Sequence, residues 1–230
     1  MRGLAIAASL LLSTAGILAA DTAQERLDKS ARVFSEIMRA PDNNIPQNLL
    51  EKAACVVILP GVKKAAFVVG GEFGHGFVEC RRQGGTGWGA PAAVKFEGGS
   101  VGWQIGGESA DIVMLVMNRH GMDKLLGDKV TLGADASVAA GPVGRTANAN
   151  TDLKLTAEIL AWSRTKGLFA GIALNGASLR PDKDENAKLY GRGMSTREVV
   201  MDNTAPPAAA HPLIAELDRY SGMSNADRVK

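Results

Sequence analysis

The feature of this sequence that most constrains its fold is the distribution of its glycines. Of the 27 glycines, 24 lie between Gly61 and Gly193, where they separate short apolar runs rich in β-branched residues. Such runs are typical of antiparallel strands, and a glycine within a strand marks a bulge, a bend or a close backbone approach. The runs follow no fixed period, which argues against a propeller or a solenoid. The region therefore predicts a glycine-rich antiparallel sheet or a partly closed barrel.

Helical patterns flank this glycine-rich region on both sides. Before it, apolar residues recur every three or four positions, which predicts a helix over residues 24–39 that buries Leu27, Phe34 and Met38. A second helix is expected soon after it, and three more segments beyond Pro181 read as helices. The predicted fold class is α+β, with N-terminal and C-terminal helices packed on the sheet.

The first 20 residues have the layout of a secretory signal peptide. Arg2 precedes a long apolar run, and two alanines supply small residues before a cleavage point near Ala20. Serine and threonine interrupt the run, so we expect cleavage rather than a membrane anchor, which needs roughly 20 apolar residues. We therefore expect a periplasmic or secreted protein with one domain over residues 21–222 and a short tail over residues 223–230.

The charge balance and the expected export exclude some function classes. The chain has 26 basic and 24 acidic residues, for a net charge of +2, whereas nucleic-acid-binding domains carry clustered basic residues and a pI above about 9. We expect no nucleic-acid partner. An exported protein also has little access to nucleotide cofactors.

The two cysteines, Cys55 and Cys80, leave two readings open. In an oxidising compartment they can form a disulfide, which would stabilise the fold by roughly 3–4 kcal/mol. Cys55 also opens the apolar run CVVIL, where it can be a small buried hydrophobic residue. The sequence does not decide between the two.

Two glycine motifs resemble nucleotide-binding loops but lack the residues that carry the chemistry. Gly71 and Gly76 have the spacing of a phosphate-binding loop, yet apolar residues follow where lysine and serine or threonine are required. The stretch from Gly85 to Ala90 fits a dinucleotide pattern, but it follows no strand and opens no helix. We expect no cofactor.

His75 and Cys80 are the strongest candidates for catalysis, because a nearby base can activate a thiol. They lie near Glu72 and Glu79 in a stretch that reads as a strand or hairpin, where a surface histidine and a structural cysteine are the commoner outcome. No histidine has a second ligand at the spacing that zinc sites use. We expect no catalytic residue and no metal site.

Several segments resemble, in the same order, the SYLF domain, a lipid-binding module also described as an actin-binding domain in eukaryotic endocytic proteins. They lie between Ala23 and Ser221: CVVILPGVKKAAFVVGGEFGHGFVECR, WGAPAAVKFEGGSVGWQIGGESADIVMLVMN, LGADASVAAGPVGR, AEILAWSRTKGLFAGIALNGASL and NAKLYG. The resemblance implies a non-enzymatic domain that binds membrane phospholipid through basic residues and an amphipathic N-terminal helix. This chain resembles exported bacterial members with one domain. Such a protein would not meet actin scaffolds, so actin binding is not carried over.

The leading hypothesis is a module of the cell envelope that binds an anionic phospholipid or membrane surface. The alternative is a structural or envelope-stress protein that binds another envelope protein through its glycine-rich sheet. A thiol-dependent or carboxylate hydrolase is a third hypothesis, which the motifs disfavour.

Two groups of residues are predicted to contact lipid. A single strand over residues 65–80 would be about 53 Å long, so we expect it to fold back at its glycines. The resulting hairpin would gather four cations and two inserting aromatic side chains: Lys63, Lys64, Arg81, Arg82, Phe73 and Trp88. The second group is basic and lies on the N-terminal helix: Arg26, Lys29, Arg32 and Arg39. It would contact headgroups if the apolar face of that helix docked into a membrane. Packing of this face on the sheet is the simpler expectation.

Overall fold

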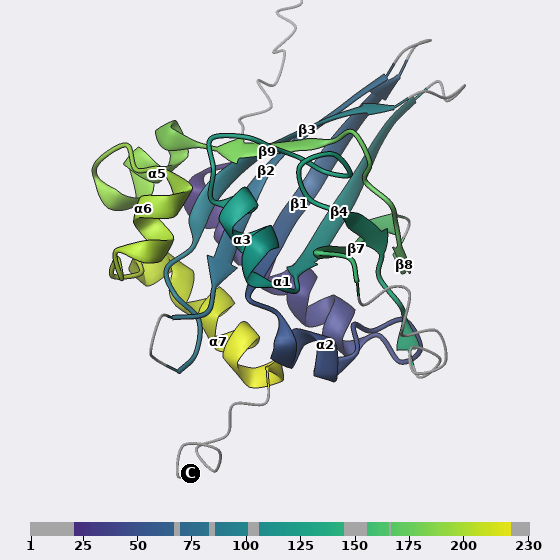
Figure 1. Ribbon diagram of the computed structural model, residues 1–230, viewed down its shortest axis with the longest axis horizontal. Coiled ribbons are helices and arrows are strands. Elements are labelled where there is room, and N and C mark those ends of the chain that lie inside the picture. The colour runs from purple at the N-terminus through teal and green to yellow at the C-terminus, as the bar shows by residue number, and fades with distance from the viewer. Residues whose placement is uncertain are drawn as a thin grey trace, which may run out of the picture.

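The structure is a computed structural model that describes residues 21–66, 70–82, 86–100, 106–144, 156–165 and 167–221. The predicted signal peptide and C-terminal tail lie outside the described residues. Within them, the chain forms one sheet with helices on both of its faces (Figure 1).

The sheet contains nine strands among the described residues, in the order β5-β9-β3-β2-β1-β4-β7-β6, with β8 also paired to β7. All pairs are antiparallel except β6 with β7. The strands are β1 (Cys55–Ala66), β2 (Gly70–Cys80), β3 (Ala92–Ser100), β4 (Gly106–Val116), β5 (Val130–Thr131), β6 (Val138–Ala140), β7 (Ile159–Thr165), β8 (Leu168–Gly171) and β9 (Ser178–Pro181).

The sheet curls into a half-barrel. Only residues 172–177 connect β8 at one side of the sheet to β9 at the other. Six inter-strand spacings separate these strands, about 29 Å in a flat sheet, whereas the seven Cα steps that join them extend at most about 25 Å. The sheet therefore bends toward this connection. We call the face inside the bend the inner face and the opposite one the outer face.

The helices confirm the predicted α+β class. They are α1 (Ala23–Arg39), α2 (Gln47–Lys52), α3 (Arg119–Leu125), α5 (Lys183–Tyr190), α6 (Thr196–Met201), the short 3-10 helix η2 (Ala208–Ala210) and α7 (His211–Tyr220). The helix predicted over residues 24–39 is α1, and Leu27, Phe34 and Met38 are buried as expected. The side chain of Thr22 accepts a hydrogen bond from the Glu25 N–H and so fixes its start.

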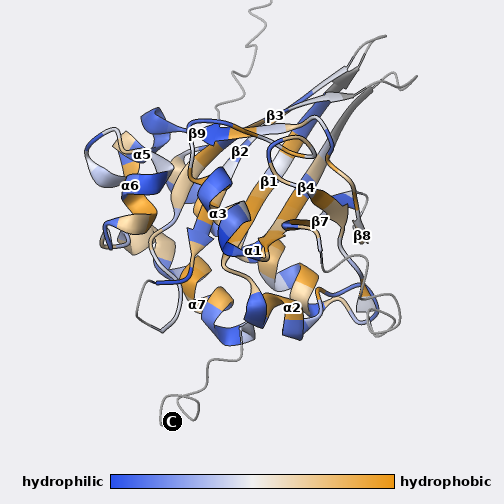
Figure 2. Ribbon diagram, in the orientation of Figure 1, coloured by the Kyte–Doolittle hydropathy of each residue, from blue (hydrophilic) through white to orange (hydrophobic). Residues whose placement is uncertain are grey.

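Each face of the sheet has its own apolar core, as the orange bands on the strands indicate (Figure 2). On the outer face, α1 and α7 pack over residues such as Phe77, Val113 and Trp162. On the inner face, side chains from α3 and α6 pack against Val57 and Met114. The expectation that the apolar side of the N-terminal helix packs on the sheet is confirmed.

The predicted hairpin forms between β1 and β2, but not every glycine expected to turn the chain does so. β1 runs from Cys55 to Ala66 with a bulge at Pro60 and Gly61, which adds one residue relative to both neighbouring strands. Gly74 and Gly76 do not turn the chain but lie inside β2 opposite the bulge. A Cβ at Gly76 would lie 2.0 Å from the carbonyl oxygen of Ile58, so this glycine permits close approach of two backbones.

Candidate functional site

The most distinctive part of the surface is the end of the sheet where β1–β2 and β3–β4 project beyond the helices (Figure 1). We call this projecting part the arm end; its described residues are 63–66, 70–73, 97–100 and 106–109. Glycine is concentrated there, at Gly70, Gly71, Gly98, Gly99, Gly106 and Gly107. Because glycine supplies no side chain to pack, these four strand ends extend without a core of their own.

One exposed apolar side chain lies in the arm end and another lies across the inner face from it. Among the described residues, the large hydrophobic side chains that remain exposed are Phe73, at 52%, and Leu168, at 70%. Phe73 lies directly opposite Lys63 in the β1–β2 pair, and Leu168 lines a groove together with Lys64 of the arm. In sequence, the connection after Ala66 is FVV and the connection after Ser100 is VGWQI. Both connections are mainly apolar and lie outside the described residues.

The inner face opens into a groove at the same end. We call it the inner groove; it has a volume of about 480 Å³ and its walls come from β1, β2, β3, β4, β7, β8 and the connection from β8 to β9. Lys64 and Glu72 form an ion pair of 3.2 Å on one wall. Apolar residues form much of the rest, including Ile112, Leu168 and Ile172. The groove can therefore accept an apolar group close to a charged one.

The four predicted cations do not converge, so this part of the hairpin prediction is wrong. Lys63 and Lys64 pair with Phe73 and Glu72 at the arm end. Arg81 follows Cys80, which lies opposite Cys55 at the other end of the strands. Eight residues separate Cys55 from Lys63, which corresponds to roughly 25 Å. The long β1 strand, with its bulge, places the two pairs at opposite ends.

Arg81 has a structural role at that other end. Its side chain donates to the carbonyl oxygens of Leu50, Glu51 and Ala53 at the C-terminus of α2, and its guanidinium lies 4.1 Å from the ring centre of Trp88. Trp88 is fully buried and donates from Nε1 to Ser221 Oγ, 3.2 Å away. Trp88 is therefore closed to lipid, which corrects that prediction, and the half-buried Arg81 is engaged in structural contacts.

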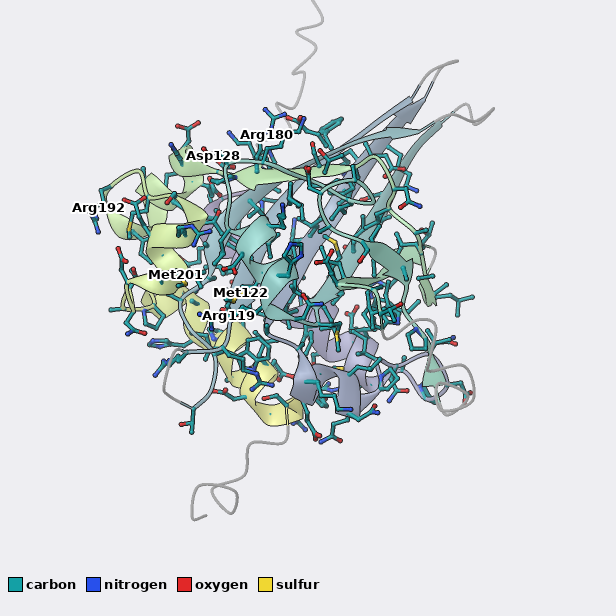
Figure 3. All side chains as sticks on the ribbon, viewed as in Figure 1. Arg119, Met122, Asp128, Arg180, Arg192 and Met201 are labelled. Carbon is teal, nitrogen blue, oxygen red and sulfur yellow. A yellow bond between two sulfur atoms is a disulfide. The ribbon has the colours of Figure 1, made fainter. Side chains whose placement is uncertain are left out.

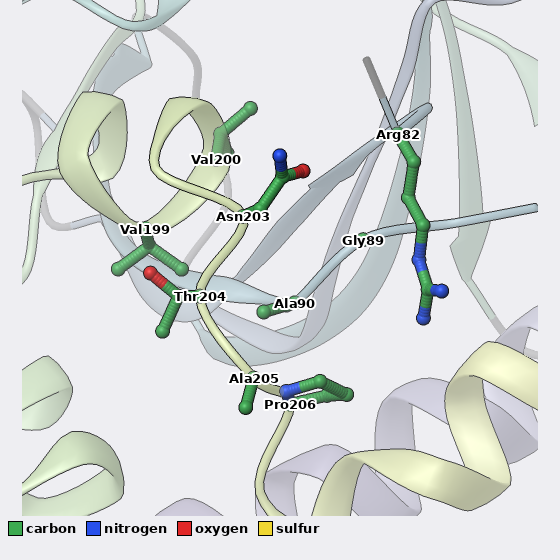
Figure 4. A pocket seen from close by; sticks show the side chains of 9 residues that line it. All are labelled: Arg82, Gly89, Ala90, Val199, Val200, Asn203, Thr204, Ala205 and Pro206. Carbon is green, nitrogen blue, oxygen red and sulfur yellow. The ribbon is translucent and has the colours of Figure 1, made fainter. Parts of the chain in front are cut away.

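Arg82 lines a second cavity, of about 310 Å³ (Figure 4). Its Nε donates to the Trp88 carbonyl oxygen at 2.9 Å. The cavity lies between the connection from β2 to β3 and the segment after α6, and its other lining residues are Gly89, Ala90, Val199, Val200 and Asn203 to Pro206. It is therefore remote from the arm end and from Lys63.

The basic residues of α1 differ in exposure and do not form one cationic surface. Arg26 is buried and forms an ion pair with Glu185 of α5, so its predicted headgroup contact is wrong. Lys29 pairs with Asp21 at 2.6 Å. Arg32 and Arg39 are exposed, and Arg39 donates to the Tyr220 hydroxyl of α7. Since the apolar side of α1 is covered by the sheet and α7, this helix cannot dock on a membrane through it.

Cys55 and Cys80 form a disulfide between directly paired positions of β1 and β2. Both residues are buried in the inner core. Cys80 therefore has no thiol to act as a nucleophile, and the proposed pairing with His75 fails. His75 instead lies 2.8 Å, through its Nδ1, from Asp182.

Asp182 is a polar centre that the sequence did not reveal. It caps the N-terminus of α5 and also contacts Lys95 Nζ at 3.2 Å. Burial alone would raise the pKa of this carboxyl, but hydrogen bonds from His75, the Glu185 N–H and Lys95 outweigh it and lower the pKa to about 2. The aspartate is therefore charged at every physiological pH and fastens α5 to β2 and β3.

Glu79 is a second polar residue that sequence reasoning missed. It is 2% exposed, and within the described part of the chain neither of its carboxyl oxygens has a hydrogen-bond partner. Burial, with a smaller effect from Asp218, raises the pKa of Glu79 well above its usual value. Its burial depends on its position in β2, next to Cys80 and paired with Val56 of β1, which the sequence alone does not give.

Arg164 forms the main polar contact between α1 and the sheet. It pairs with Glu36 of α1 and, at 2.6 Å, with Asp111 of β4, and its guanidinium lies over the Phe169 ring. The other carboxyl oxygen of Asp111 accepts from the Gly61 N–H of the bulge at 2.8 Å. These residues are engaged in holding the fold.

Among the described residues, the end of the molecule formed by α5 and α6 has no exposed large hydrophobic side chain. Arg192 lies at this end, far from the projecting strands (Figure 3), and Met201 of α6 packs partly against the inner core. No described helix has the length and apolar character needed to cross a membrane. Within the described ranges, no group of three histidine, cysteine or acidic residues is placed to hold a metal ion.

Comparisons with known proteins find similar chains. A family model described as Ysc84, Las17-binding protein actin regulator, matches residues 97–220. The human SH3 domain-containing YSC84-like protein 1 is 34% identical over 196 residues, which cover 84% of this chain and 57% of the human protein. A Schizosaccharomyces pombe SH3 domain-containing protein is 38% identical over 178 residues, which cover 76% of this chain and 41% of that protein.

LAS seventeen-binding protein 3 of Saccharomyces cerevisiae is 31% identical over 199 residues, which cover 83% of this chain and 43% of the yeast protein. The chain thus spans about half the length of the curated relatives it matches. The resemblance found in the sequence is confirmed by these similarities.

Proposed function

Because the chain belongs to the Ysc84 family, which contains the SYLF domain, we propose that it is a non-enzymatic domain that binds phospholipid membranes through its arm end. The observation that supports this most directly is the exposure of Phe73 and Leu168, the large hydrophobic side chains that remain exposed among the described residues. Phe73 lies in the arm end beside Lys63 on the outer face, and Leu168 lies on the inner face, at the rim of the groove that reaches the arm end. Both side chains can therefore enter a membrane that meets this end of the sheet.

The proposed contact is more apolar than the sequence suggested. Transfer of Phe73 and Leu168 from water into a membrane interface contributes about 2 kcal/mol each, and the exposed Lys63 contributes about 1 kcal/mol at an anionic surface. Together these correspond to a submillimolar dissociation constant. Lys64 adds little, because Glu72 already neutralises it. We therefore expect anionic lipid to strengthen binding only modestly.

Co-sedimentation with liposomes tests this proposal. The double variant Phe73→Asp/Leu168→Asp should lose most of its binding to vesicles of phosphatidylcholine and phosphatidylglycerol. The matched control, Ala208→Asp/Ala215→Asp, adds the same charge at two exposed alanines near the C-terminus and should bind as the native protein does. Equal binding by both double variants, each folded by circular dichroism, would contradict the proposed surface.

Binding to another protein is the second candidate function. The observation in its favour is the description of the matched family, which names Las17 binding and actin regulation. For this chain we keep an envelope protein as the alternative partner, and we do not extend actin binding to it. Chemical cross-linking in cells, followed by identification of the captured protein, supports this alternative if the native protein also fails to sediment with any liposome.

Export to the periplasm or the medium is part of the proposal. The first 20 residues have the composition of a signal peptide, and the Cys55–Cys80 disulfide suits an oxidising compartment. N-terminal sequencing of the protein from the periplasmic fraction should begin at or near Asp21. Recovery of the uncleaved chain from the cytoplasm would contradict this localisation.

A further inference from the structure

We infer that the inner groove holds one acyl chain of a phospholipid, so that the domain takes a lipid tail into its half-barrel. This inference rests on the proposed membrane-binding function, which it deepens. It identifies a part of the lipid and a place in the fold that the arm-end contact does not require.

The half-barrel is filled at one end and open at the other. Around the disulfide, the inner face is packed by buried side chains, among them Val57, Met114 and Leu125. Toward the arms, β3 and the arm strands have glycines or polar residues in place of large apolar ones, and the groove of about 480 Å³ begins. This volume lies in the range of small-molecule sites. The curl of the sheet therefore encloses the inner core at one end and leaves the inner groove at the end toward the arms.

The groove wall suits a hydrocarbon chain. Ile112, Leu168, Ala170 and Ile172 line it from β4, β8 and the connection that follows β8. Ala170 is exposed although it lies opposite Ser163 on the inner side of the sheet. Apolar surface that faces a cavity is stabilised when a chain of methylene groups displaces water from it.

The polar groups of the groove suit a lipid headgroup region. Lys64 and Glu72 form their ion pair on the wall from the arms, and their side chains are 35% and 14% exposed. Ser163 and Thr165 of β7 place hydroxyl groups, which can donate to a phosphate, on the same lining. The groove also continues into the arm end through Lys64, Glu72, Gly98 and Gly99. A tail that enters from a membrane touching the arms thus follows a continuous path.

Binding of palmitoyl lysophosphatidylglycerol, a phospholipid with one chain, tests this inference. Native mass spectrometry and calorimetry below its micelle concentration should show one bound molecule per chain. The variant Ala170→Trp fills the groove and should weaken binding at least about tenfold, because several methylene groups lose their site. The matched variant Ala215→Trp, at an exposed alanine of α7, should bind as the native protein does.

A second filling variant guards against misfolding of the first. A Cβ at Gly98 would make ordinary contacts of 3.5 Å with Ala177 and Glu72, so Gly98→Leu adds bulk from the opposite wall. If both folded variants retain native affinity for the lysolipid, or if the native protein does not bind it, the inference is overturned.

Failure of this inference is distinguishable from failure of the proposed function. If the native protein sediments with liposomes but binds no lysolipid, the groove inference is rejected and the proposed membrane contact stands. If the native protein binds lysolipid, Ala170→Trp abolishes that binding, and the native protein does not sediment with liposomes, the groove inference is supported and the proposed membrane contact is rejected.

Discussion

At the scale of single residues, two buried carboxyl groups control how this fold responds to pH, and they act in opposite directions. Asp182 accepts hydrogen bonds from His75, Lys95 and the first turn of α5. Glu79 has no partner among the described residues. On the same outer side of β2 and β3, the surroundings lower the pKa of Asp182 and raise the pKa of Glu79.

The variant Asp182→Asn should lower the free energy of unfolding at pH 7 by about 2 kcal/mol, because asparagine keeps the helix cap but loses both charge pairs. The pKa of Asp182 falls from 3.8 when unfolded to about 2 when folded. Its contribution is therefore complete above about pH 4 and disappears as pH falls toward 2. Urea denaturation at pH 7 and at pH 2.5 measures both values, and the gap between native and variant proteins should shrink to roughly a third at the lower pH.

Asp184→Asn is the control for this prediction. Its carboxyl lies 3.6 Å from the same Lys95, but its side chain is 89% exposed. Exposed ion pairs contribute little, so the variant should match the native protein at both pH values. An equal loss in both variants would contradict a special role for Asp182.

The variant Glu79→Gln should stabilise the protein, and the gain should grow from pH 5 to pH 8. The folded state raises the pKa of Glu79, so it binds a proton that the unfolded chain releases above about pH 4.5. Stability is thus lost as pH rises toward the folded pKa, and glutamine removes this loss. Urea denaturation at the two pH values gives the result; a gain that does not change with pH would place the effect in packing rather than in titration.

At the scale of elements, a few specific contacts join helices and strands that are separated in the sequence. The disulfide joins the first residue of β1 to the last of β2. Helix α1 contacts α5 through Arg26 and the sheet through Arg164. At the arm end, strands are joined by the ion pairs Lys64–Glu72 and Glu97–Arg180, and this end is the part proposed to bind a partner outside the protein.

The disulfide should stabilise the fold by about 3.5 kcal/mol, the loop-closure value for a separation of 25 residues. The double variant Cys55→Ala/Cys80→Ala should lose about this amount in urea denaturation. Alkylation of the denatured native protein without reductant should add no mass. Addition of two alkyl groups would show that the cysteines are not bridged.

Helix α1 should be required for folding. Phe34→Ala removes a fully buried ring between the sheet and α7 and should cost about 3–5 kcal/mol. Arg32→Ala, on the exposed side of the same helix, should change stability by less than about 0.5 kcal/mol. Thermal unfolding distinguishes them, and a Phe34→Ala protein as stable as the native one, yet unable to bind liposomes, would revive the helix as a membrane anchor.

At the scale of the whole molecule, the half-barrel explains why sequence patterns predicted the class of the fold but not its site. Periodicity identified α1 and its buried Leu27 and Phe34, because helical spacing and burial are local properties. The separation of Lys63 from Arg81 depends on strand pairing, and the fully buried Trp88 depends on α7, far along the chain. Of the predicted cation cluster, only the placement of Lys63 beside Phe73 puts two exposed candidates together.

The bulge at Pro60 and Gly61 also shifts the phase of β1. Leu59 and Val62 both belong to the inner core, although three steps along a regular strand would place them on opposite faces. With a regular strand, the same sequence would put Lys63 in the groove and Lys64 on the outer surface. Deletion of one residue would remove the bulge and restore regular alternation, so Lys63 would stay on the outer face and Lys64 would stay in the groove. The number of residues in the bulge, and not their type, therefore decides which of the two lysines faces the inner groove.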